Sequence, residues 1–120
     1  MTRFGLLITS GSYSCQTLSS VLSFVTAAIK AGHVIDHIFL YQDAVYSIAA
    51  DIDLPSDEPN VSILLAQFCQ QHDIALMFCV TAAEKRGVTS AERPAISGYV
   101  AAGLAEFAMR QAQIDKLVQF

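Results

Sequence analysis

Cys79 is the residue whose type and position point most directly to chemistry. It lies near the end of the apolar run Ile74–Val80, and a segment of small and then basic residues follows it. This pattern predicts a buried strand that ends in a turn, with the thiol where the chain leaves the core. In open α/β sheets, ligands bind at that edge. Free cysteine is also among the most buried residue types, so an inert core thiol and a nucleophile both stay open.

A second thiol, Cys15, competes for the role of nucleophile. It lies near the expected N-terminus of a helix, where backbone amides stabilise a thiolate. Lys85 and Arg86 are close enough to Cys79 in sequence to add positive potential, or they form a solvated basic pair.

The loop after the first strand is the other part of the expected site. Loops that follow the first and third strands often lie side by side at the switch point of a parallel sheet. We therefore expect Gly11, Tyr13 and Cys15 to lie near Cys79 as substrate or partner residues. The same loop, rich in hydroxyls from Thr9 to Ser14, could instead cradle a phosphate, as in a small flavin- or nucleotide-binding module. It lacks both the GxGxxG pattern and a Walker-type lysine.

The elements that must position these residues follow from hydrophobic periodicity. Strands are predicted at Arg3–Thr9, Val34–Tyr41, Ile74–Val80 and Ile114–Phe120, and helices at Gln16–Ala31, Val61–Gln71 and Val100–Gln111. The opening strand, helix and strand predict a right-handed βαβ unit. The sequence therefore predicts one α/β domain over residues 1–120, with a mostly parallel central sheet flanked by helices.

The remaining polar and sulfur residues mostly exclude other chemistries. The acidic cluster Asp51, Asp53, Asp57 and Glu58 lacks regular ligand spacing and is read as a solvated loop, with no metal site expected. His33, His37 and His72 do not fall at a strand exit, which disfavours a Cys-His hydrolase.

Cys69 falls on the buried stripe of a helix and is read as a small core residue. An odd number of cysteines without a CxxC pair argues against a disulfide framework and for a cytoplasmic protein with reduced thiols.

Composition limits the partners. The net charge is -4 and the basic residues form no stripe, so direct binding to a nucleic-acid backbone is not expected. Hydrophobic residues make up 53% of the chain, yet no apolar run is long enough to span a bilayer. The surplus apolar surface therefore predicts contacts with partner subunits rather than with a membrane.

The segment Ala75–Val88 resembles the active-cysteine segment of the DsrE/TusD family. Arg3–Thr9 with Gly11 and Tyr13 resembles the family's first strand and loop, and the ending Leu117–Phe120 resembles its closing strand. Further similar positions are Phe39, Tyr41, Val45 and Tyr46, and the stretch from Ser97–Gly98 through Leu104–Glu106. Two departures stand out: the region from Gly87 to Ser97 looks shorter than in the family, and Cys15 replaces a small residue.

The resemblance implies a DsrEFH-like fold and a sulfurtransferase subunit that carries a persulfide on Cys79, with no cofactor and no metal. It implies TusB-like and TusC-like partner subunits in a heterohexamer, a TusA-like sulfur donor and a TusE-like acceptor. The sulfur would serve 2-thiolation of the wobble uridine of tRNA, or sulfur oxidation as in the DsrE branch. A non-catalytic scaffold subunit is the alternative that these residues leave open.

Overall fold

The computed structural model describes residues 1–11 and 16–120, and its centre is a five-stranded, wholly parallel sheet. The strands are β1 (Arg3–Ile8), β2 (Val34–Leu40), β3 (Ala75–Cys79), β4 (Val100–Ala102) and β5 (Lys116–Gln119), in the spatial order β4-β3-β2-β1-β5. The predicted α/β fold with a parallel sheet is therefore confirmed, and each carboxyl end of a strand lies at the same edge of the sheet.

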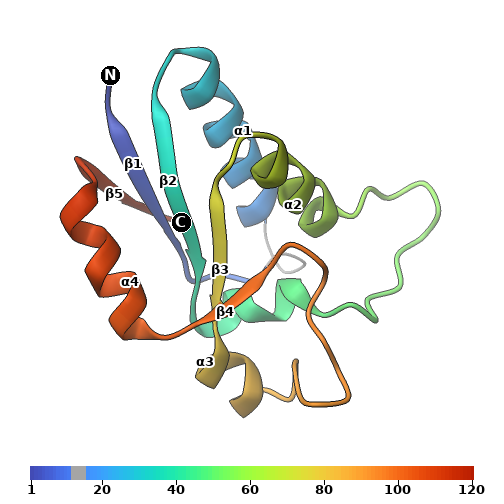
Figure 1. Ribbon diagram of the computed structural model, residues 1–120. Coiled ribbons are helices and arrows are strands. Elements are labelled where there is room, and N and C mark those ends of the chain that lie inside the picture. The colour runs from blue at the N-terminus through green and yellow to red at the C-terminus, as the bar shows by residue number, and fades with distance from the viewer. Residues whose placement is uncertain (12–15) are drawn as a thin grey trace.

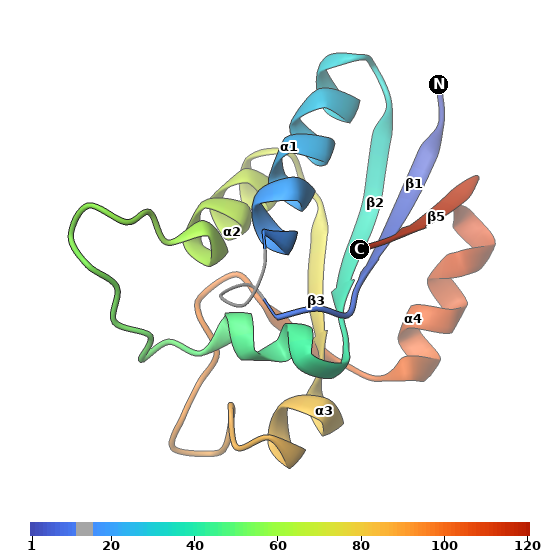
Figure 2. The same ribbon diagram turned by 180° about the vertical axis from the view of Figure 1, so that it is seen from behind.

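Helices cover both faces of this sheet. They are α1 (Thr17–Lys30), α2 (Val61–Gln71), α3 (Val80–Lys85) and α4 (Leu104–Arg110), with the 3₁₀ helices η1 (Gln42–Ile48) and η2 (Gln111–Gln113). The ribbon views show α1 and α2 on one face and α4 on the other, while α3 and η1 lie at the carboxyl edge (Figures 1 and 2). Because successive right-handed crossovers run from β1 to β2 to β3, their helices share one face.

The core lies between the sheet and its helices. Its largest fully buried side chains include residues of β1 and β2 and of the inward stripes of the helices: Leu6, Ile8, Leu18, Val21, Val25, Ile38, Phe39, Leu40, Ile48 and Leu65. β2 lies at the centre of the sheet, and all of its residues after Val34 are buried. A strand covered by helices on both faces is mostly apolar, and Val34–Tyr41 was recognisable from the sequence although it contains Asp36 and His37.

Two local predictions are wrong. The segment after Cys79 was expected to turn, but α3 begins directly at Val80, because its alanines favour helix until Gly87 adopts a φ of 67°. The predicted helix Val100–Gln111 begins only at Leu104. Its first three residues instead form β4, whose Val100 pairs with Met77 of β3. This pairing adds an edge strand to the sheet, and tertiary contacts override the local helical pattern.

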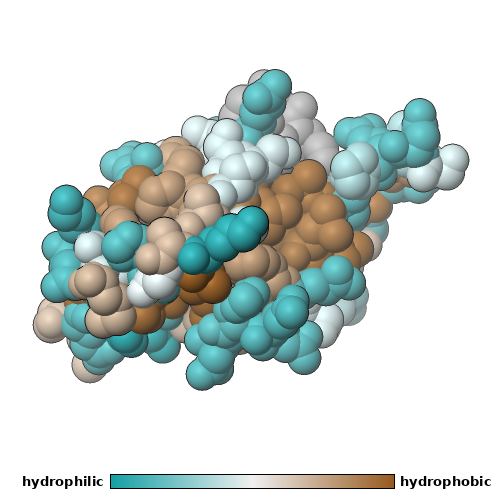
Figure 3. Space-filling model, turned by 90° about the horizontal axis from the view of Figure 1, so that it is seen from above, coloured by the Kyte–Doolittle hydropathy of each residue, from teal (hydrophilic) through white to brown (hydrophobic). Residues whose placement is uncertain are grey.

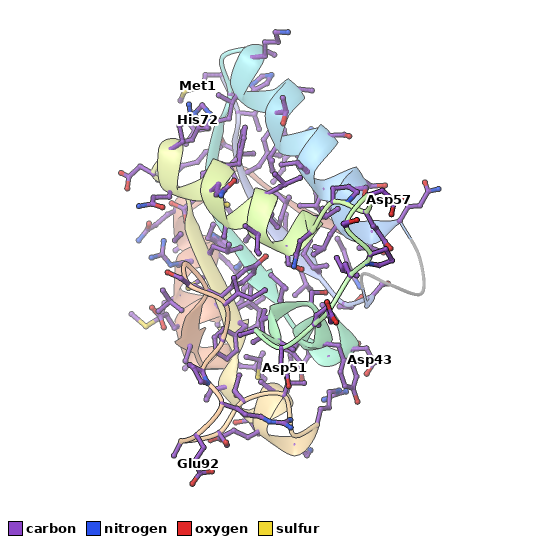
Figure 4. All side chains as sticks on the ribbon, turned by 90° about the vertical axis from the view of Figure 1, so that its right-hand side faces the viewer. Met1, Asp43, Asp51, Asp57, His72 and Glu92 are labelled. Atoms are coloured by element: carbon purple, nitrogen blue, oxygen red, sulfur yellow. The ribbon has the colours of Figure 1, made fainter. Side chains whose placement is uncertain are left out.

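The acidic loop is solvated, as expected. Asp51, Asp53, Asp57 and Glu58 are all exposed, and Asp57 extends from the loop that precedes α2 (Figure 4). Within residues 1–11 and 16–120, no helix is both long and apolar enough to cross a bilayer.

Candidate functional site

Cys79 is the last residue of β3 and the residue that caps the N-terminus of α3. Its Sγ accepts a hydrogen bond from the backbone N–H of Ala82 at 3.5 Å. The side chain is buried, with only 4% of the residue exposed. The thiol therefore lies in a fixed position at the carboxyl edge of the sheet, with a backbone donor directed at the sulfur.

A pocket of about 400 Å³ has Cys79 in its wall. Its other lining residues come from three neighbouring strand exits: Tyr41 and Gln42 after β2, Thr81, Ala82, Lys85 and Arg86 after β3, and Gly103 and Leu104 after β4. Because β3 lies between β2 and β4, the parallel sheet brings these exits together around the sulfur. The pocket is large enough to hold more than the thiol alone.

Two cationic side chains, Arg86 and Lys85, line this pocket and differ in their hydrogen-bond and ion-pair partners. Arg86 donates from Nε to Oδ1 of Asp43 at 3.0 Å and from one terminal nitrogen to the carbonyl of Ala82 at 3.2 Å. Lys85 is exposed, and in the described part of the chain it forms no ion pair. Lys85 is thus the cation available to an incoming anionic group, while Arg86 holds α3 against η1.

The strand order differs from the one on which the predicted place of the first-strand loop rests. The sheet order places β2 between β1 and β3, so the strands that precede the two loops are not adjacent. Gly11 is not among the described residues that line the pocket. Tyr13 and Cys15 lie outside the described residues, so their places relative to Cys79 stay predictions. The prediction assumed that β1 and β3 are adjacent, and the sheet order contradicts that assumption.

The sequence reading placed Cys79, Lys85 and Arg86 at one site, and the structure brings these three together. It missed Tyr41, Gln42, Gly103 and Leu104 as lining residues. Tyr41 and Gln42 follow the second predicted strand directly, which was a usable signal. Gly103 and Leu104 gave none, because β4 was hidden inside an apparent helix.

Polar side chains around the buried Asp36 and His37 of β2 hold α4 against the sheet. The first residue of α4, Leu104, lines the Cys79 pocket. Asp36 is bound by His37 (Nδ1–Oδ2 2.8 Å), by Arg3 and by Arg110 of α4 (3.3 Å). Gln111 donates to Nε2 of His37 at 3.3 Å, and the ring of Phe107 stacks on Phe39 with centroids 4.8 Å apart. No residue of α4 is buried, so these polar and aromatic contacts anchor the helix.

Opposing effects set the pKa values in this cluster. Burial lowers the pKa of His37, and the hydrogen bond to Asp36 only partly offsets it. Burial alone would raise the pKa of Asp36, but hydrogen bonds from His37, Arg3 and Arg110 outweigh it, and the net pKa is lowered. His37 is therefore neutral and Asp36 ionised near neutral pH. His37 pairs with Ala75 at the opposite end of β3 from Cys79, so it cannot serve as a base for that thiol.

Cys69 has the inert role expected of it. It is buried on α2, and this burial raises the pKa of its thiol to about 12. Such a thiol is protonated at neutral pH and does not act as a nucleophile. In the part of the chain that the structure describes, no group of three or more His, Cys, Asp or Glu side chains could hold a metal ion.

Comparisons with known proteins identify the family. The curated protein "Sulfurtransferase TusD" of Erwinia tasmaniensis is 36% identical over 128 residues, covering 98% of this chain and 99% of that protein. The crystal structure of the ychN protein from E. coli has the same fold, with a TM-score of 0.82, 21% identity and full coverage of both chains. The MTH1491 protein from Methanobacterium thermoautotrophicum, titled as of unknown function, gives a TM-score of 0.66 at 13% identity over 98% of this chain and 99% of its own. The model of the DsrE/DsrF-like family matches residues 2–120, and the chain belongs to this family.

Proposed function

We propose that this chain is a sulfurtransferase subunit that accepts a sulfur atom on Cys79 and passes it on as a persulfide. One observation carries the proposal: Cys79, held at the carboxyl end of β3, lines a pocket together with Lys85, which forms no ion pair with any residue that the structure describes. Membership of the DsrE/DsrF-like family and the likeness to a protein named Sulfurtransferase TusD support this activity.

The reaction needs no oxidant and no cofactor. The Cys79 thiolate attacks the outer sulfur of a donor persulfide, R–S–SH, and the donor's S–S bond breaks. The donor leaves as R–S⁻, and Cys79 becomes Cys–S–SH. An acceptor thiolate then attacks that outer sulfur, and the electron pair of the second S–S bond returns to Cys79. The Ala82 N–H at 3.5 Å from Sγ stabilises the thiolate that forms in this step.

The burial of Cys79 is compatible with this exchange. An S–S bond is about 2 Å long, so the added sulfur extends beyond the buried Sγ into the space of the pocket. A pocket of about 400 Å³ also leaves room for the end of a partner's cysteine-bearing segment. Lys85, at the wall of the same pocket, would attract the partner's anionic sulfur.

The partners are part of the proposal. We assign TusB-like and TusC-like subunits as permanent neighbours, a TusA-like donor and a TusE-like acceptor, acting in the cytoplasm. The exposed large apolar residues Tyr46, Ile63, Leu64, Val100, Leu104, Met109 and Leu117 support subunit contacts. Apolar residues also form broad patches on the face shown in Figure 3. For the end use of the sulfur we favour 2-thiolation of tRNA over sulfur oxidation, because the 36% identical relative is named as a TusD rather than a DsrE protein.

A sulfur-chase experiment tests this function. The protein, with TusB-like and TusC-like subunits, is mixed with a TusA-like carrier loaded with ³⁵S, and a TusE-like acceptor is added afterwards. We expect label on this chain first and then on the acceptor, with both steps lost in Cys79→Ser. Direct passage from carrier to acceptor at the same rate without Cys79 would show a scaffold subunit instead.

A further inference from the structure

Gln42 has a backbone conformation that is unusual for its residue type. Its φ is 52°, in the left-handed region that most side chains avoid. In residues 1–11 and 16–120, the other positions with positive φ are held by Gly32, Gly87, Gly98 and Asp73. Glycine adopts this region freely, and aspartate tolerates it better than most residues. Gln42 is thus the one long side chain that the described chain holds there.

This backbone conformation coincides with the Cys79 pocket. Gln42 follows β2, lines the pocket with Cys79, and is exposed. Asp73, by contrast, lies at the turn between α2 and β3, at the other end of the strand that carries Cys79. If the turn after β2 required only its bend, glycine would supply it without strain. Strained backbone conformations gather at functional sites, so the position of Gln42 at this pocket points to a role for its side chain.

The Gln42 side chain is free to bind a ligand. Within the described residues its amide group has no hydrogen-bond partner. An amide carries two N–H donors, which suit an anionic sulfur. Arg86 on the same pocket is already bound to Asp43 and to the Ala82 carbonyl, so its guanidinium is less available for this role.

We propose that Gln42 binds the outer sulfur of the Cys79 persulfide, donating a hydrogen bond from its side-chain amide to the atom that is transferred. This inference rests on the proposed persulfide function and names a further residue of the same site. The reaction is unchanged: a thiolate attacks the outer sulfur, one S–S bond breaks, and the leaving thiolate takes the electron pair. Gln42 holds the transferred sulfur in line between the two thiolates and stabilises the negative charge that spreads onto it.

Two substitutions of Gln42 distinguish the effect of its side-chain amide from the effect of its strained backbone conformation. Gln42→Met keeps the length of the side chain and the left-handed backbone but removes the donor. Gln42→Gly removes the donor and also relieves the strain. Asp73→Gly is the matched control, because it relieves a positive φ of 56° away from the pocket. Each variant is assembled with the partner subunits, and single-turnover sulfur transfer from a loaded TusA-like carrier is measured beside the melting temperature.

We expect Gln42→Met and Gln42→Gly to slow sulfur transfer about 3- to 10-fold, the effect of one hydrogen bond. Gln42→Gly should also raise the melting temperature by about 2 to 6 °C, so that a more stable protein is the slower one. Asp73→Gly should raise stability and leave the rate unchanged. The rate at which unloaded Cys79 is alkylated should not change in Gln42→Met.

Wild-type transfer rates in Gln42→Met would overturn the assignment of Gln42 and leave the persulfide function standing. Equal slowing by Asp73→Gly would overturn it too, because the rate would then follow the backbone rather than the amide. If wild-type Cys79 takes up no sulfur from a loaded donor, the proposed function fails and this inference fails with it. The three outcomes are distinguishable in one series of measurements.

Discussion

Arg86 and Asp43 form an ion pair, with Nε 3.0 Å from Oδ1, that joins the end of α3 to the start of η1. The pair links the segment that follows β3, the strand that ends in Cys79, to the segment that follows the neighbouring strand β2. It also neutralises one of the two cations at the pocket. The charge that an approaching anionic partner meets is therefore set chiefly by Lys85.

Replacement of Lys85 by glutamine should slow the acceptance of sulfur. We expect a decrease of about 2- to 5-fold in the second-order rate constant, because exposed charges at a binding rim act mainly on association. The dependence of that rate on salt should weaken as well. Lys30→Gln at the end of α1 changes the net charge equally and is the control. Equal effects of the two variants would show that net charge, and not the pocket, controls the rate.

Asp43→Asn frees the guanidinium of Arg86 while changing little in shape. Exposed ion pairs contribute about 0.2–1 kcal/mol, so we expect a loss of stability within that range in urea unfolding. Association with an anionic donor should become faster, since a second cation becomes available at the pocket. Arg86→Gln should lose similar stability without the gain in rate. A faster donor reaction in Arg86→Gln would contradict this account.

Gly5 leaves the space that the buried His37 ring occupies. A Cβ added at Gly5 would lie 2.5 Å from Cε1 of His37 and 2.8 Å from Cδ1 of Ile114. His37 is fully buried, so neither it nor the strand can move freely, and Gly5→Ala should cost about 1–3 kcal/mol of unfolding free energy. Gly103→Ala is the control, because nothing lies within 4 Å of its Cβ position. A stability loss no larger than that of Gly103→Ala would refute the tight packing.

The His37–Asp36 pair should make stability depend on pH. The pKa of His37 is lowered in the folded protein. Below about pH 6.5 the imidazole of His37 is therefore protonated more readily in the unfolded chain than in the folded one. Stability should therefore fall as the pH decreases from about 6.5. The lowered pKa of Asp36 adds a further loss below about pH 4, where the unfolded carboxyl becomes protonated.

Chemical denaturation between pH 8 and pH 4 measures this dependence. His37→Gln keeps a polar side chain but cannot bind a proton, so its stability curve should be flatter than the wild-type curve between pH 7 and pH 5, whatever its absolute stability. Parallel curves for the two proteins would mean that His37 does not carry the effect.

The Cys69 thiol should not react with thiol reagents in the folded protein. With its pKa raised to about 12 by burial, it should react with iodoacetamide only when the protein unfolds. Peptide mapping after a timed pulse, with and without urea, checks this. Rapid alkylation of Cys69 in the native protein would show that α2 opens.

The parts of the fold that follow from the sequence are those whose pattern is local. β2 and β3 are mostly apolar segments, and α1 ends at Lys30, two residues before Gly32, close to the end that the capping residues indicated. Cys79 was recognised because it ends such a segment. The pairing of Val100–Ala102 with β3 is a long-range event, and short edge strands carry little signal of their own.

Strand order was the other feature that local patterns could not supply. A strand, helix, strand unit fixes handedness but not whether β3 lies beside β1 or beside β2. With β2 next to β3, Tyr41 and Gln42 line the pocket of Cys79, and Gly11 is not among the described residues that line it. The Asp36–His37 cluster depends on a register shift between β1 and β2 at Phe4 and Gly5, which no sequence period reveals.

The most direct test of the central claim is where sulfur becomes attached. The wild-type protein, Cys79→Ser and Cys69→Ser are incubated with a cysteine desulfurase, cysteine and a TusA-like carrier, then studied by intact mass and peptide mapping. We predict a reducible gain of one sulfur atom on Cys79 in the wild type and in Cys69→Ser, and none in Cys79→Ser. No sulfur on Cys79 from a carrier shown to be loaded, or sulfur on Cys15 instead, would contradict the account.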